Sequence, residues 1–181
     1  MNNKYLTKSL FIIGLQCPRK LYYTLNPDIY ENKKLADPFL QALAQGGFQV
    51  GALAKIYYPE GIDLEGLSTK DAINRTNELL TMEKVIIFEA AINHGDMLVK
   101  IDVLKKDGNN LYLYEVKAKS YNPITDSFLD SKNKYIKSEW AKYLNDVAFQ
   151  TYVLKKYAPY LTVMPLICAA FSRHFPLQTA A

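Results

Sequence analysis

Two acidic residues and a lysine stand within a segment that otherwise predicts two adjacent β-strands. In KIDVLKKDGNNLYLYEVK, residues 100–117, Asp102 lies in the first apolar run, and Glu115 and Lys117 lie in the second. Carboxylates on facing strands repel each other unless a cation neutralises them, and Mg²⁺ or Mn²⁺ can do so while binding oxygen ligands. A lysine beside such a metal can polarise water or neutralise a phosphoryl oxygen. The residue types therefore predict a site for metal-assisted hydrolysis.

The turn between these two runs decides whether the acidic side chains meet. Asp107-Gly108-Asn109-Asn110 has the composition of a hairpin turn, and a hairpin closed there places Asp102 directly opposite Glu115. Lys117 then shares their face, because side chains alternate along a strand. The alternative interpretation is a solvated face on which carboxylates and lysines simply form salt bridges.

A preceding hairpin is predicted by Asn93-His94-Gly95-Asp96. With His94 and Gly95 at its tip, Glu89 pairs with Lys100 and lies beside Asp102. One face of the resulting three-strand meander would carry Glu89, Lys100, Asp102, Glu115, Lys117 and Lys119 among Val85, Ile87, Leu98, Leu104 and Leu113. The other would carry Ile86, Phe88, Ala90, Ile92, Met97, Val99, Ile101, Val103, Tyr112, Tyr114, Val116 and Ala118. We therefore expect the uncharged face to form the core and the charged face to form the site.

Helical and extended patterns alternate along the rest of the chain. Helices are predicted over 9–16 with Thr7 as N-cap, 18–25, 39–58, 68–82 with Ser68 as N-cap, and 139–157. Strands are predicted over 84–92, 96–104, 111–119 and 161–171, the last at a sheet edge or bulge because it contains Pro165. The expected fold class is α/β, with a mixed central sheet and a three-strand antiparallel meander flanked by helices.

Length and composition describe one ordinary globular domain. The chain has 181 residues, of which 49% are hydrophobic. Its net charge of +4 is compatible with a polyanionic partner but does not by itself indicate one. We expect a single domain over 1–181, with a helical N-terminal part (1–83), a sheet-and-helix catalytic core (84–168) and a tail (169–181). No apolar run is long enough to cross a bilayer, and the two cysteines, Cys17 and Cys168, suggest reduced thiols in the cytoplasm.

The motifs resemble the PD-(D/E)XK nuclease superfamily, specifically its RecB-like branch that includes CRISPR-associated exonucleases. The resemblance is carried by Ile101-Asp102, the triplet Glu115-Val116-Lys117, and Gln150 with Tyr152 in a later helix. The segments CPRKLYY, FEAAI, IDVL, YEVKAKS and DVAFQTYVL are similar to the nuclease-like N-terminal part of an uncharacterised bacterial family. The resemblance implies a restriction-endonuclease-like core (αβββαβ) and a partner, DNA.

The resemblance also implies roles for individual residues. Asp102, Glu115 and the Val116 carbonyl would hold Mg²⁺ or Mn²⁺, Lys117 would assist the attacking water, and Gln150 would orient the site. Related nucleases often add a histidine ligand that has no counterpart here. Glu89 could replace it, although a salt bridge to Lys100 is the competing expectation.

Candidate substrate contacts and a second class of function complete the expectations. Candidate substrate-binding residues are Arg19, Lys20, Lys119 and Tyr152, with solvated helix ends as the alternative for the first two. The later cysteines of iron–sulfur members are missing, so no iron–sulfur cluster is expected and Cys17 should be a small buried apolar side chain. Members of the uncharacterised bacterial family are usually longer than this chain, which leaves open a further domain or protein partner. The alternative function is a catalytically inactive nuclease-fold module for DNA binding or complex assembly.

Overall fold

The computed structural model describes residues 5–32, 51–122, 124–132 and 134–170. Its elements follow in the order β1 (Leu6–Thr7), α1 (Lys8–Gln16), α2 (Pro18–Leu25), β2 (Ile62–Asp63), α4 (Thr69–Leu79), β3 (Lys84–His94), β4 (Met97–Asp107), β5 (Asn110–Ser120), α5 (Ser138–Tyr157) and β6 (Thr162–Ala170). Residues 51–57 are also helical and confirm the part of the predicted helix 39–58 that falls within the described residues.

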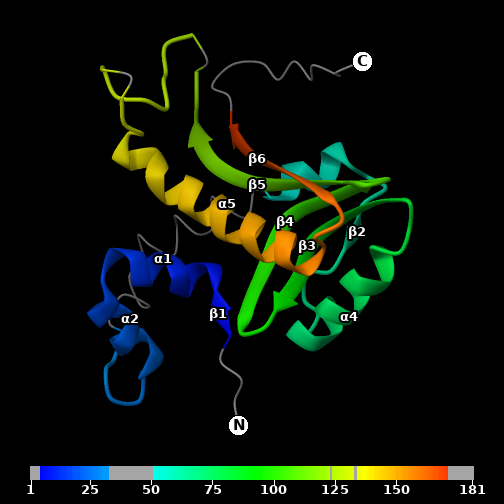
Figure 1. Cartoon of the computed structure of the whole chain (residues 1–181), viewed down its shortest axis with the longest axis horizontal. Helices are drawn as coiled ribbons and strands as arrows, with labels where there is room; N and C mark the ends of the chain where they lie inside the picture. Colours follow the sequence, from blue (N-terminus) through cyan, green and yellow to red (C-terminus); the bar gives the residue numbers. More distant parts are fainter. Residues whose placement is uncertain (1–4, 33–50, 123, 133, 171–181) are drawn as a thin grey trace.

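A mixed six-stranded sheet forms the centre of the molecule (Figure 1). The strand order is β2-β3-β4-β5-β6, and β1 pairs with β4 outside this path. β3, β4 and β5 form the antiparallel meander, whereas β1, β2 and β6 pair in parallel with their neighbours. The predicted α/β class with helices against a mixed sheet is thus confirmed, and β6, which contains Pro165, lies at an edge as expected.

The predicted helices form where their capping residues indicate. The Thr7 hydroxyl accepts a hydrogen bond from the Leu10 N–H at the start of α1, and Ser68 accepts one from Asp71 at the start of α4. Each cap satisfies a backbone donor that the first helical turn would leave unpaired. β1 and β2 were not predicted, because two residues are too few to show a hydrophobic period. The part assigned to 1–83 is therefore not purely helical.

The register of the second hairpin is as predicted, and that of the first is wrong by two residues. β4 and β5 pair from Val103 with Tyr114 to Asp107 with Asn110. In the first hairpin Lys100 lies opposite Ala91 rather than Glu89. The cause is the turn: its two central residues are Gly95 and Asp96, and Gly95 has φ 56°. A glycine at the first central position with positive φ is what a type II′ hairpin requires, so His94 remains in the strand.

The predicted division into a charged face and an uncharged core face is also wrong. Ile87 and Leu104 share the main core with Ala90 and Ile101, which strict alternation would place on the opposite face. The side chains of β3 and β4 exchange faces of the sheet at Glu89. Among the described residues other than glycine, Glu89 is the one with a positive φ, which is 55°. A residue in this conformation breaks the two-residue alternation, so apolar side chains on both sides of it turn toward one helix layer.

The two faces of the sheet carry unequal cores. The main core joins the sheet to α5 through buried side chains such as Val147, Val153 and Leu154. A smaller cluster of Ile86, Phe88 and Val103 packs against the helical segment 51–57 and Tyr58 on the other face. In Figure 1, α5 crosses the sheet diagonally, and α1 lies close to it. The site described below lies where α1, α5 and the kinked strands meet.

Two sequence expectations outside the sheet can also be compared with the structure. Cys17 is exposed rather than buried, because it is the residue between α1 and α2 and packs into no core. Within the described ranges, no helix has the length and apolar character that a bilayer crossing needs. His174 and the tail beyond Ala170 lie outside the described residues.

Candidate functional site

The site begins where β4 and β5 separate. β4 pairs with β1 at Met97 and Leu98 and with β5 from Val103 onward. Residues 99–102 of β4 pair with neither strand, and we call this gap between β1 and β5 the fork. Asp102 lies in the fork, and its Oδ2 accepts a hydrogen bond of 2.7 Å from the Val116 backbone N–H. The Asp102 carboxylate thus takes the place of a backbone acceptor and fixes the distance between the two strands.

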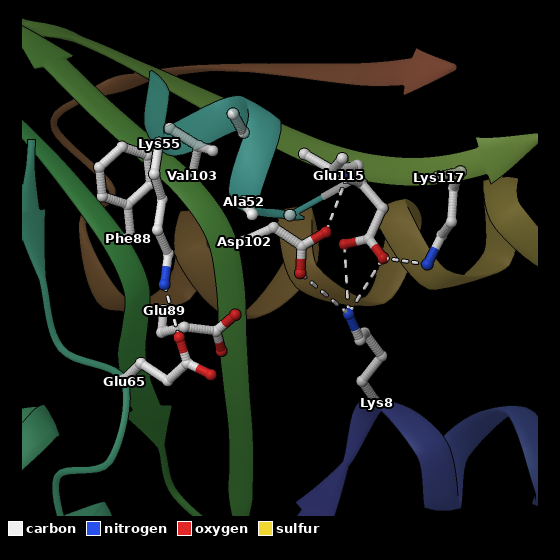
Figure 2. Close-up of a pocket in the computed structure, with 13 residues that line it drawn as sticks. Lys8, Ala52, Lys55, Glu65, Phe88, Glu89, Asp102, Val103, Glu115 and Lys117 are labelled. Atoms are coloured by element: carbon white, nitrogen blue, oxygen red, sulfur yellow. Dashed lines mark hydrogen bonds and ion pairs between the residues drawn. The ribbon is translucent and has the colours of Figure 1, made fainter. Parts of the chain in front are cut away.

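Glu115 is the centre of the site and is completely buried. Its carboxylate accepts hydrogen bonds from Lys8 Nζ at 3.0 and 3.2 Å, from Lys117, and from Gln150 Nε2 at 2.6 Å. Figure 2 shows Asp102, Glu115, Lys117 and Lys8 turned toward one another. A buried carboxylate needs partners of this kind, since an isolated ion in the interior would be strongly destabilising.

α5 closes the site from the sheet's main core side. Asp146 and Gln150 are one helical turn apart, and Gln150 Nε2 donates to Asp146 Oδ1 at 3.1 Å as well as to Glu115. Asp146 lies 3.8 Å from Lys8 Nζ and 3.3 Å from Lys117 Nζ. Gln150 Oε1 is buried and has no hydrogen-bond partner among the described residues. The helix therefore adds a third carboxylate and a free acceptor oxygen.

The site's titratable groups shift one another's pKa values. Burial and the negative charge of Glu115 raise the pKa of Asp102 and of Asp146 to about 6. Burial alone would also raise the pKa of Glu115, but the ammonium groups of Lys8 and Lys117 outweigh it and lower that pKa. Burial likewise opposes the charged forms of the two lysines, yet Glu115 and the other carboxylates raise the pKa of each. Glu115 is thus ionised and both lysines are charged at neutral pH.

A pocket of about 440 Å³ opens beside this cluster. Its lining includes Lys8, Asp102, Glu115 and Lys117 on one wall, and Glu89 with a second charged group on the other (Figure 2). In that second group Lys55 Nζ lies 2.5 Å from Glu65, and it also lies 2.7 Å from Asp63, which is outside the pocket lining. The pocket therefore gives a ligand access to carboxylates and ammonium groups together.

Several residues that the sequence singled out meet at this place. Asp102, Glu115, Lys117 and Gln150 form one hydrogen-bonded group, and the Val116 backbone belongs to it. Glu89 lies opposite Asp102 in the register of β3 and β4 and lines the pocket. Burial raises the pKa of Glu89, which Lys100 partly offsets.

The candidate substrate-binding residues lie elsewhere in the described structure. Arg19 and Lys20 are exposed on α2, and Tyr152 is 52% exposed on α5. Lys119 pairs with Glu139 at 2.8 Å and lies 4.7 Å from the centre of the Trp140 ring. The described residues that line the pocket include none of these four.

Two members of the site, Lys8 and Asp146, were not identified from the sequence. Asp146 had a usable signal: it precedes Gln150 by four residues on a helix, so the two share a face. Lys8 had none, because a separation of 107 residues divides it from Glu115 and the strand that positions it has two residues.

Comparison with known proteins adds no relative: no family model, curated protein or solved structure matches the chain.

Within the described part of the molecule, no three Asp, Glu, His or Cys side chains are already arranged around a metal position. The three carboxylates instead have a cation of the protein in common. Lys8 Nζ lies within 3.9 Å of Asp102, Glu115 and Asp146, and such hard oxygen donors suit Mg²⁺ or Mn²⁺.

Proposed function

We propose that the chain is a metal-dependent nuclease that hydrolyses DNA phosphodiester bonds on a restriction-endonuclease-like core. The observation that carries this proposal is the convergence of Asp102, Glu115 and Lys117 on one wall of the pocket. An acid pair can hold a divalent cation, and an adjacent lysine can stabilise the charge that develops on a phosphate oxygen. The order of the elements, three antiparallel strands followed by a helix and a parallel strand, supports the same fold.

The donor set fits a hard divalent cation. Asp102, Glu115 and Asp146 supply carboxylate oxygens around a position that a positive charge already occupies. When bound there, Mg²⁺ or Mn²⁺ would lower the pKa of a water molecule and polarise the phosphate. Asp102 and Glu115 would hold the ion, and Glu89 is available from the opposite side of the pocket.

The remaining residues have their own roles in the proposed reaction. Lys117 can stabilise negative charge on a phosphate oxygen or orient the attacking water, because its ammonium is charged and reaches the pocket. Gln150 fixes Glu115 and Asp146 through two hydrogen bonds and keeps Oε1 free as an acceptor. It therefore acts as a positioning residue.

Cleavage of labelled DNA by purified protein tests the proposal. End-labelled single- and double-stranded oligonucleotides should be degraded with Mn²⁺ or Mg²⁺ and remain intact with EDTA. Asp102→Asn and Lys117→Met should each reduce the rate by roughly 10²–10⁴-fold, while circular dichroism reports an unchanged fold. Asp107→Asn is the matched control on the same strand, since Asp107 pairs with the exposed Lys84 and lies outside the cluster. Full activity in Asp102→Asn and Lys117→Met, or none in the wild type, rejects the proposal.

A second candidate function is a DNA-binding module without catalysis. The observation that favours it is Lys8, whose ammonium already neutralises the carboxylates that would bind the metal. This candidate expects DNA affinity that falls steeply with salt and no cleavage with either metal. Salt-dependent binding of the same oligonucleotides in a fluorescence-anisotropy titration, together with no cleavage, supports the second function, and cleavage rejects it.

A further inference from the structure

Lys8 is the cation that the three carboxylates of the site have in common. Its Nζ lies 3.0 Å from Glu115, 3.8 Å from Asp146 and 3.9 Å from Asp102. These residues come from β5, α5 and β4, so a single ammonium connects three elements. Asp102, Glu115 and Asp146 contribute three negative charges, against two positive charges from Lys8 and Lys117. Removal of Lys8 would leave a net excess of two negative charges in a buried place.

The backbone of Lys8 is held firmly, while its ammonium is carried on a flexible stem. Thr7 pairs with Leu98 of β4 and caps α1, so the helix begins at the edge of the sheet. The Phe11 ring stacks on Phe149 of α5 with a centroid distance of 4.6 Å, which fixes α1 against the other side of the site. The ammonium itself stands at the end of four methylene groups and can move while the helix stays in place.

The Lys8 side chain also has access to the pocket. It is 23% exposed and lines the pocket, whereas Glu115 is fully buried. An ammonium that leaves the carboxylates can therefore reach water without unfolding its surroundings. A divalent cation entering from the pocket meets the same carboxylates, and two cations in such close contact repel each other. Both cannot occupy the position together.

We propose that Lys8 is a resident counter-ion of the site, which a divalent cation must displace from Asp102, Glu115 and Asp146 before it can bind. This inference rests on the proposed function, because it assumes that the carboxylates receive a metal. Lys8 holds the carboxylates together in the metal-free protein and sets the metal concentration at which the site loads. The displaced ammonium turns toward the pocket.

Calorimetric titration with Mn²⁺, which requires no substrate, tests this competition. Lys8→Met removes the competing charge and keeps the length of the side chain, so it should bind Mn²⁺ about tenfold more tightly than the wild type or better. Lys8→Gln should change the affinity in the same direction and serves if the methionine variant does not fold. Lys155→Met, an exposed lysine in the last turn of α5, is the matched control and should leave the affinity unchanged.

Two further variants locate the effect at the site. Lys8→Arg keeps the positive charge and should bind Mn²⁺ no more tightly than the wild type. The gain in affinity caused by Lys8→Met should be smaller in a protein that already carries Asp102→Asn than in the wild type, because both residues contact one position. An equal gain in the two backgrounds overturns the assignment.

The outcomes separate this inference from the proposed function. Equal or weaker Mn²⁺ affinity in Lys8→Met than in a wild type that does bind the metal overturns the role of Lys8 and leaves the proposed function standing. Absence of Mn²⁺ binding in both proteins overturns the metal site, and the proposed function with it. Binding that appears only in Lys8→Met supports the displacement.

Discussion

Asp102 differs from an ordinary surface aspartate because it enters a buried group that already contains an ionised carboxylate. Its environment opposes a second negative charge, which is why its pKa is raised to about 6. Lys8 and the Val116 N–H act in the opposite direction and keep the residue titratable rather than permanently neutral. The residue thus has a measurable effect on the stability of the metal-free protein.

Replacement of Asp102 by asparagine should change how stability depends on pH. Between about pH 4 and pH 6 the folded wild type retains a proton on Asp102 that the unfolded chain has lost, so its free energy of unfolding falls as pH rises. Asparagine has no proton to lose. Relative to the wild type, Asp102→Asn should therefore gain about 1–3 kcal/mol between pH 4 and pH 7, measured by urea unfolding with EDTA present.

The exposed Asp107 provides the control for this measurement. Asp107→Asn, on the same strand, should give a nearly constant difference from the wild type over the same pH range. A constant difference for Asp102→Asn as well would mean that the residue ionises in the folded protein as readily as in the unfolded chain.

Sequence alone could predict the acid pair, because the signal is local. The turn at 107–110 and the alternation on either side of it fix how β4 and β5 align, and Val103 and Tyr114 pair accordingly. Gln150 came from a motif, and Asp146 could have come from helical spacing. Lys8 could not have been found in this way, since its contact with Glu115 depends on the folded sheet rather than on neighbouring residues.

At the scale of the element, β3 contains the conformation that shapes the site. Glu89 has a positive φ, which costs an L-residue other than glycine about 1–2 kcal/mol. The sequence FEAAI contains no residue that predicts a positive φ. The first hairpin and the two faces of the sheet were therefore assigned incorrectly. The conformation turns the apolar residues after Glu89 toward the main core and leaves its carboxylate at the pocket.

Paired substitutions at Glu89 should reveal the cost of this conformation. Glycine accepts positive φ without strain, so Glu89→Gly should be more stable to urea than Glu89→Ala by about 1 kcal/mol. At Asn93, an ordinary position of the same strand, the order should reverse and the alanine variant should be the more stable. An alanine variant that is the more stable one at both positions would show that Glu89 is not strained.

At the scale of the whole molecule, burial is distributed unevenly. β3, β4 and β5 supply fully buried residues such as Ile87, Ile101 and Leu113, whereas neither α1 nor α2 contains a buried residue. α1 is anchored by Phe11 and Lys8, while α2 presents Tyr22 and Tyr23 largely to solvent. Local opening should therefore be far easier at α2 than in the meander.

Hydrogen exchange followed by mass spectrometry should show this gradient. Peptides covering α2 should exchange orders of magnitude faster than peptides covering β4, because their amides can open without disturbing the core. Lys8→Met should accelerate exchange in α1 and leave β4 unchanged. Equal protection of α2 and β4 would mean that the N-terminal helices unfold only together with the sheet.

The distance along the chain between the site's members has a consequence for biosynthesis. Glu115 is made 107 residues after Lys8 and 35 residues before Gln150. At the usual speed of translation, roughly 5–20 residues per second, the ribosome needs about 2–7 s to pass from Glu115 to Gln150. During that interval the nascent polypeptide holds the acidic strand without the helix that completes it. The complete hydrogen-bonded group around Glu115 can therefore form only after α5 has emerged from the ribosome.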